Sequence, residues 1–261
     1  MQHIAKAFSG VSALKDAQLT LRKGSVMALV GENGAGKSTL MRILTGIYNH
    51  DGGSILYKGQ PVHFQNAMQA RAAGIAIIHQ EFNLFPNLTV AENIFLGDKS
   101  VQAHGFVNWN AMYRRAQELV DSIGGTFSVQ EKVQALSVQN QQVVEIVKAL
   151  AANAEVLIMD EPTSALPESE VQHLFRTIRG LKARGVAIVY VAALAQGELC
   201  VFQRRYARER LGDVLHFQYG FAHQIPSFAS ARINARFTLP HSVRRRIQHA
   251  VALRVRQMDA V

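Results

Sequence analysis

The stretch VMALVGENGAGKSTLMRIL, residues 26–44, decides the fold of this chain. It opens with the apolar run VMALV and closes with Leu40, Ile43 and Leu44 at helical spacing. The pattern predicts a short buried strand, a glycine-rich loop and a helix that begins near Ser38.

The loop GENGAGKS, residues 31–38, fits the pattern G-x-x-x-x-G-K-[ST]. Glycines let the backbone wrap closely around phosphate oxygens, Lys37 can reach the β- and γ-phosphates, and the Ser38 hydroxyl can ligate Mg²⁺. The N-terminal end of the following helix adds positive potential. The alternative is a glycine-rich turn with a structural role alone. The nucleotide-binding residues expected from this loop are Gly31, Glu32, Asn33, Gly34, Ala35, Gly36, Lys37, Ser38 and Thr39.

A second motif, LIMDEP, places two carboxylates at the end of another apolar strand. Asp160 can hold Mg²⁺ directly or through water, and Glu161 is suited to polarise the water that attacks a γ-phosphate. The alternative is a pair of solvated acids at a strand end. With the phosphate loop present, we expect a site for a nucleoside triphosphate and Mg²⁺.

Outward from these motifs, the chain alternates between predicted strands and helices. Further strands are expected at GIAIIHQ (74–80), EVLIMD (155–160) and VAIVYV (186–191), and a hairpin within residues 51–64. Residues 84–150 form a predominantly helical insertion by pattern, and residues 167–185 form a helix. The sequence therefore predicts an α/β fold with a mostly parallel sheet.

Composition divides the chain near residue 192. The net charge is +9, and residues 193–261 contain eleven basic residues, all arginine, against four acidic ones. Cys200 is the only cysteine, which suits a reducing cytoplasm. We expect no secretory signal, because no charged segment followed by an apolar one opens the chain.

These motifs, together with HQEFNLFPNLTVAENIFLG and ALSVQNQQVVEIVKAL, resemble ATP-binding cassette (ABC) ATPases of the bacterial monosaccharide importer type (ribose-, xylose- or galactose-like), first cassette. The resemblance covers about 1–191. It implies a P-loop NTPase with a RecA-like core, an N-terminal antiparallel β-region and an inserted α-helical subdomain at about 84–150. Residues 192–261 are then an atypical arginine-rich tail.

Within the resemblance, three further residues receive roles. Phe8 lies where an aromatic ring stacks on adenine, with a core phenylalanine as the alternative. Gln80 matches the loop glutamine that contacts Mg²⁺ and the attacking water and senses the permease; the alternative is an ordinary surface residue. Ser137 matches the signature serine that contacts the γ-phosphate in a partner cassette, and a plain helix N-cap is the alternative.

The resemblance also implies function and partners. The expected protein is an ATPase on the cytoplasmic face of the inner membrane, peripheral to it, that energises sugar import. Its partners are transmembrane permease subunits, a second ABC cassette and, indirectly, a periplasmic sugar-binding protein.

Three departures from the family pattern put parts of this reading in question. Gln139 replaces a glycine or another small residue of the signature. Pro167 replaces an aspartate or small polar residue. After IVYV the family continues with serine and histidine, but this chain has Ala192 and Ala193, so one donor to the γ-phosphate is missing.

The departures leave several hypotheses open. The chain is either a working ATPase or a cassette fragment that binds nucleotide but is deficient in hydrolysis. The tail is either a diverged segment or the product of a reading-frame shift near codon 192. A soluble ABC ATPase acting on nucleic acid or ribosomes is a further alternative. Nucleic acid is not an expected partner, because the arginines are scattered and no nucleic-acid motif accompanies them.

Overall fold

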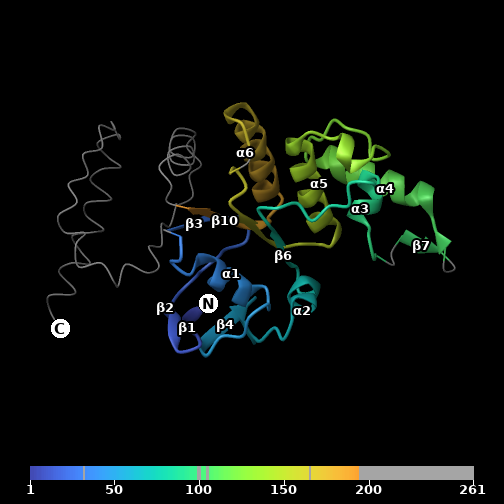
Figure 1. Cartoon of the computed structure of the whole chain (residues 1–261). Coiled ribbons are helices and arrows are strands. Elements are labelled where there is room, and N and C mark those ends of the chain that lie inside the picture. Colours follow the sequence, from blue (N-terminus) through green and yellow to red (C-terminus); the bar gives the residue numbers. More distant parts are fainter. Residues whose placement is uncertain (32, 99–100, 104–105, 165, 194–261) are drawn as a thin grey trace. The chain divides into compact units, whose positions relative to one another are not determined.

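The computed structural model describes residues 1–193 except 32, 99–100, 104–105 and 165. At its centre is a sheet of four parallel strands in the order β3-β10-β9-β6 (Figure 1). Their bounds are β3 (Val26–Gly31), β10 (Ala187–Ala193), β9 (Val156–Asp160) and β6 (Ile75–Ile78). All four strands were expected from continuous apolar runs, which are typical of parallel strands covered on both faces. The predicted α/β class is confirmed.

The two faces of this sheet pack against different elements. On β10, Ile188 and Tyr190 belong to one hydrophobic cluster and Val189 and Val191 to another, as the two-residue period of a strand requires. The first cluster continues into α5 (Val138–Ala151) and α6 (Glu168–Ala183). The second continues into α1 (Lys37–Leu44), α2 (Ala67–Ala72) and an antiparallel sheet.

The antiparallel sheet has the strand order β2-β1-β4-β5. Its strands are β1 (Gln2–Phe8), β2 (Val11–Ala17), β4 (Gly52–Tyr57) and β5 (Gln60–Val62). The hairpin expected within residues 51–64 is the β4–β5 pair, and the sheet is the N-terminal antiparallel region that the resemblance implied. Helix α2 was not predicted, because its six residues are too few to display a helical period.

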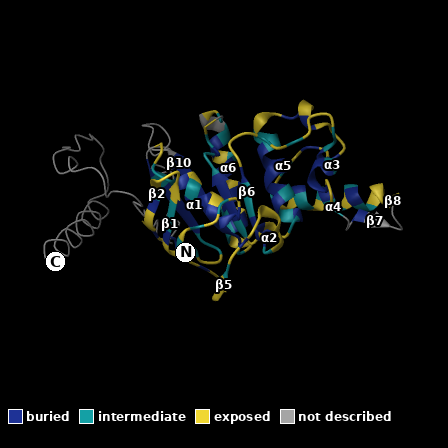
Figure 2. Ribbon diagram, turned by 60° about the horizontal axis from the view of Figure 1, so that its bottom comes forward, coloured by how far each residue is buried: buried dark blue, intermediate teal, exposed yellow. Residues whose placement is uncertain are grey.

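A third hydrophobic cluster lies in the inserted segment, between α3 (Val90–Ile94), α4 (Trp109–Ser122) and α5. Thr89 and Glu92 form a capping box at the start of α3, and η2 (Val133–Ala135) precedes α5. Buried residues of α3 and α5 appear dark blue in Figure 2.

The helical interpretation of residues 84–150 was incomplete. The segment contains an antiparallel ribbon formed by β7 (Gln102–Ala103) and β8 (Phe106–Val107). Strands of two residues are too short to show an alternating pattern, so this ribbon could not be predicted from the sequence.

Candidate functional site

The topology of the parallel sheet brings the predicted motifs to one edge. Strand β10 lies between β3 and β9, with Ala193 in register with Gly31 and Val191 in register with Asp160. Because the strands are parallel, the phosphate loop after β3 and the acids at the end of β9 lie at the same edge, on either side of β10.

The phosphate loop has the backbone that its glycines predict. Gly34 and Gly36 have φ angles of 82° and 88°, in the left-handed region that favours glycine. Gly36 is also the N-cap of α1, and as a glycine it provides no side-chain cap to the first turn of this helix. Ser38 is exposed in that turn. Such a helix end offers backbone N–H groups to an anion.

Lys37 lies under this loop with only 6% of its surface exposed. Its Nζ donates a hydrogen bond to the carbonyl of Gly31 at 2.7 Å. Burial lowers the pKa of Lys37, while the negative charges of Glu161 and Asp160 act in the opposite direction and raise it. The lysine of the first motif therefore lies within electrostatic reach of both acids of the second.

Glu161 has a strained backbone held by hydrogen bonds. Its φ is 48°, which costs on the order of 1 kcal/mol for a residue with a Cβ. Its N–H donates to the carbonyl of Val191 at 3.0 Å, and its carbonyl accepts from the N–H and hydroxyl of Ser164 at 3.1 and 2.9 Å. These bonds fix the direction in which the chain leaves β9. Asp160 and Glu161 are both half-buried.

Gln80 follows β6 closely and is exposed. Ile78 of β6 is in register with Met159 of β9, so the chain that carries Gln80 emerges beside Asp160 at the same edge. The loop that follows Gln80 is held by α5. Glu145 accepts a hydrogen bond from the N–H of Asn83 at 2.8 Å, and Lys148 donates to the Asn83 carbonyl at 3.0 Å.

Helix α5 also holds the loop that follows Glu161. The buried amide of Gln142 donates to the carbonyl of Pro162 at 2.8 Å. Sequence reasoning missed Gln142, Glu145 and Lys148 as functional positions. Their signal was a polar residue at every third position of the otherwise apolar segment 142–151 of α5, which places them close to one face.

The two residues assigned by resemblance at the periphery have clear structural environments. Ser137 is exposed at the N-cap of α5, where its hydroxyl accepts from the N–H of Asn140 at 3.3 Å. This capping bond is compatible with a contact to a partner's nucleotide, and that contact stays a prediction. Phe8 is 40% exposed, and its ring contacts Tyr48 edge to face at 5.2 Å. The alternative of a core phenylalanine is wrong.

The departures from the family pattern fall at defined places. Gln139 is half-buried in the first turn of α5, and Pro167 is the exposed N-cap of α6, a position where it offers no capping side chain. Strand β10 extends past its expected end at residue 191, so Ala192 and Ala193 pair with Val30 and Gly31. Glu32, the arginine-rich tail beyond Ala193 and its basic segment 243–258 lie outside the described residues.

The donor set suits Mg²⁺ better than a metal held by protein alone. Among the described residues, no three His, Cys, Asp or Glu side chains gather as a metal site. Ser38, Asp160 and Gln80 instead offer a few hard oxygen donors at the sheet edge, and Mg²⁺ commonly takes its remaining ligands from phosphates and water.

This fold and this edge define a P-loop nucleotide-binding protein. A family model described as "ABC transporter" matches residues 14–164, which is more than half of the chain. The chain therefore belongs to the ABC transporter family.

Curated relatives support this membership over part of their length. The chain is 52% identical over 188 residues to an Agrobacterium fabrum protein named for ribose/galactose/methyl galactoside import and ATP binding. It is 49% identical over 191 residues to a Pseudomonas syringae protein of the same kind of name. These matches cover 72% and 73% of the chain but 37% and 36% of the relatives, so the chain spans about a third of their length.

Solved structures show the same fold. The ADP conformation of an ATP-binding cassette of an ABC transporter superposes with a TM-score of 0.64 at 24% identity, covering 74% of this chain and 79% of that one. A dimeric cassette in a post-hydrolysis state, bound to ADP and Pi, gives a TM-score of 0.60 at 24% identity, covering 77% and 88%.

Proposed function

We propose that this chain binds ATP with Mg²⁺ at the edge of the parallel sheet and hydrolyses it. The observation that carries the proposal is the register of β3, β10 and β9, which brings the phosphate loop and the pair Asp160–Glu161 to one edge. The dependence of the Lys37 pKa on both acids supports it. Residues 1–191 constitute the ATPase cassette, with a helical subdomain at about 84–150.

In the proposed mechanism, backbone N–H groups of residues 31–39 and the ammonium of Lys37 bind the phosphates and neutralise their charge. Glu161 orients and polarises the attacking water, and its hydrogen-bonded backbone keeps the carboxylate positioned. Ser38, Asp160 and Gln80 would hold Mg²⁺, which supplies charge stabilisation on the phosphate oxygens when bound. Phe8 stacks on adenine.

The proposed assembly contains a second cassette, because Ser137 lies exposed at the start of α5, where it can contact a nucleotide held by another copy. Closure around ATP and opening after hydrolysis then drive a permease between two states. Helix α5 can transmit these changes, since it bonds to the loops after both Gln80 and Glu161.

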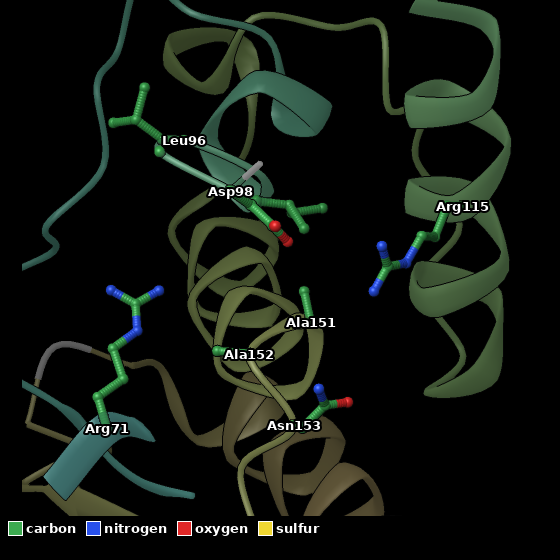
Figure 3. Close-up of a pocket in the computed structure, with 9 residues that line it drawn as sticks. Arg71, Leu96, Asp98, Arg115, Ala151, Ala152 and Asn153 are labelled. Atoms are coloured by element: carbon green, nitrogen blue, oxygen red, sulfur yellow. The ribbon is translucent and has the colours of Figure 1, made fainter. Parts of the chain in front are cut away.

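A cleft between the core and the helical subdomain offers a surface for the permease. It has a volume of about 500 Å³ and is lined by Arg71 of α2, Arg115 of α4, Asp98 and the C-terminal end of α5. In Figure 3, the side chains of Arg71 and Arg115 approach the cleft from opposite sides. We propose that a cytoplasmic loop of a transmembrane permease docks here.

No helix of the described residues is long and apolar enough to cross a membrane.

The relatives' names direct the proposal to monosaccharide import, with a periplasmic sugar-binding protein as an indirect partner and the cytoplasmic face of the inner membrane as the location.

One observation favours a second candidate, a cassette that binds ATP but hydrolyses it slowly. Ala192 and Ala193 occupy the end of β10, between the phosphate loop and the acids, where the family has a serine and a histidine. Neither alanine carries a side-chain donor. Loss of one such transition-state contact costs on the order of 100-fold in rate.

Phosphate release by the purified chain, measured with Mg-ATP, separates the two candidates. Release at an ordinary turnover rate that is lost in Lys37→Ala supports a working ATPase. ATP binding with release about 100-fold slower supports the second candidate. Lys58→Ala is the matched control, because Lys58 is an exposed lysine paired with Glu155 and should leave release unchanged. Release that persists in Lys37→Ala would contradict both.

A further inference from the structure

Two neighbouring side chains contact the Phe8 ring. Tyr48 contacts it edge to face, with ring centroids 5.2 Å apart and an interplanar angle of 67°. The ammonium of Lys6 lies 5.4 Å from the Phe8 centroid. Phe8 is nevertheless 40% exposed, so the ring is oriented by its neighbours without being covered by them.

Tyr48 is in turn attached to α1. Arg42, in the last turn of this helix, donates from Nη1 to the Tyr48 hydroxyl at 3.1 Å, and its guanidinium lies 5.7 Å from the tyrosine ring centroid. The N–H of Tyr48 donates to the Arg42 carbonyl at 3.0 Å. The orientation of the tyrosine ring is therefore fixed relative to the helix that begins at the phosphate loop.

Asp51 holds the strand that carries Phe8. Its N–H donates to the Ala5 carbonyl at 2.8 Å, and its carboxylate accepts from Lys6 Nζ and from the N–H of Ala7, both at 2.7 Å. These two side-chain hydrogen bonds, that from Lys6 first, lower the pKa of Asp51, so it is ionised at neutral pH. The register of the β1–β2 pairing shifts between Lys6 and Ala7, and at this point the Asp51 carboxylate accepts from the N–H of Ala7.

We propose that Tyr48 and Asp51 are positioning residues for the nucleotide base. The inference rests on the proposed function, in which Phe8 stacks on adenine. Tyr48 orients the ring and Asp51 orients its strand, and both follow α1, whose first turn faces the phosphates. The segment after α1 thus sets the base platform relative to the phosphate site, so that one ligand reaches both without rearrangement of the protein.

This arrangement predicts an effect on the base and none on the phosphates. An aromatic pair of this geometry contributes enough to change affinity by about 2- to 10-fold. Tyr48→Ala should weaken Mg-ATP binding by that factor and leave the affinity for Mg-tripolyphosphate, which has no base, unchanged. Tyr48→Phe keeps the ring and should bind ATP within about twofold of the wild type.

Calorimetric titration of each variant with Mg-ATP and with Mg-tripolyphosphate tests the proposal, with thermal melting to confirm folding. Asp51→Asn provides a second route that does not alter the ring, and it too should weaken ATP binding alone. Tyr113→Ala is the matched control, a half-buried tyrosine that contacts Trp109 in the helical subdomain and should change neither affinity.

Two results overturn the proposal. The first is an ATP affinity of Tyr48→Ala and Asp51→Asn equal to that of the wild type. The second is an equal loss of affinity for ATP and for tripolyphosphate in these variants. Either result excludes a positioning role. In both cases the proposed function is not affected, provided that the wild-type chain still binds tripolyphosphate at its phosphate site. A wild type that binds neither ligand instead overturns the proposed function itself and the inference with it.

Discussion

Strands β3 and β10 lie side by side in the parallel sheet, yet the residues at their carboxyl ends differ in their ability to bind phosphate. After β3 the chain enters a loop with Gly34 and Gly36 in left-handed conformations, a buried lysine and an open helix end. At the same edge, β10 ends in Ala192 and Ala193, which pair with Val30 and Gly31 and carry no polar side-chain atom.

We infer that this difference affects nucleotide binding and nucleotide hydrolysis unequally. In the proposed site, the groups that bind the triphosphate lie in the loop after β3 and at the start of α1. Except for Ser38, those that act on water and Mg²⁺ lie at or just after the ends of β9 and β6. Strand β10, between them, ends in two alanines that offer no side-chain donor. We therefore expect nucleotide binding at an ordinary level together with a slow chemical step.

The largest effect is expected for Glu161→Gln. Removal of a general base costs about 10²- to 10⁴-fold in rate, whereas ATP binding should change little, because the base contacts water rather than phosphate. Single-turnover hydrolysis measures the rate. Glu155→Gln is the control, since Glu155 lies just before the first residue of β9, at the end of the strand away from Glu161, and pairs with Lys58 on the surface. Equal rates for Glu161→Gln and wild type would remove Glu161 from the mechanism.

The next largest effect is expected for a substitution at the carboxyl end of β10, where the two alanines carry no side-chain donor. Ala193→His restores a side-chain donor beside the phosphate loop and should raise the rate of hydrolysis about 100-fold, by the value of one transition-state contact. Ala193→Leu controls for size. If histidine and leucine give the same rate, the missing donor does not limit this chain.

The pH dependence of phosphate binding tests whether the buried ammonium of Lys37, in the helix after β3, binds the phosphates. Burial lowers the pKa of Lys37, so its ammonium loses a proton at a lower pH than an ordinary lysine, whose pKa is 10.5. As pH rises through the lowered pKa, tripolyphosphate affinity should fall by about 10- to 100-fold, the contribution of a charged hydrogen bond. Calorimetry across this pH range measures it. Lys37→Ala should bind weakly with no such transition, and an identical transition in that variant would assign it elsewhere.

The smallest effect concerns the connection between α5 and the loop after Glu161. Gln142→Ala leaves the Pro162 carbonyl without its donor and should lower the free energy of unfolding by about 1–3 kcal/mol. We also expect a few-fold slower hydrolysis, measured alongside chemical denaturation. Gln141→Ala is the neighbouring control, because its amide bonds to Leu136, away from the catalytic loops. Unchanged hydrolysis in Gln142→Ala would limit that residue to stability.

Much of the site could be predicted because its signals are local. The spacing of Gly31, Gly36 and Lys37 indicated a phosphate loop, and a strand that ends in acids lies at the same edge as that loop once the sheet is parallel. The continuous apolar runs of β3, β9 and β10 indicated such a sheet.

The remainder depends on contacts that no local pattern encodes. Gln142, Glu145 and Lys148 act through backbone groups of Pro162 and Asn83, which are distant in sequence. The exposure of Phe8 and its contact with Tyr48 likewise arise from the pairing of β1 with β4, which brings residue 48 beside residue 8. Such contacts become visible only when the chain is folded.

Calorimetric titration of the folded chain with Mg-ATP tests most directly whether the phosphate loop and the acids Asp160 and Glu161 form a nucleotide site. We expect saturable heat with one nucleotide per chain, greatly weakened in Lys37→Ala and retained in Glu161→Gln. Heat no larger than that of dilution from well-folded wild-type protein would contradict it.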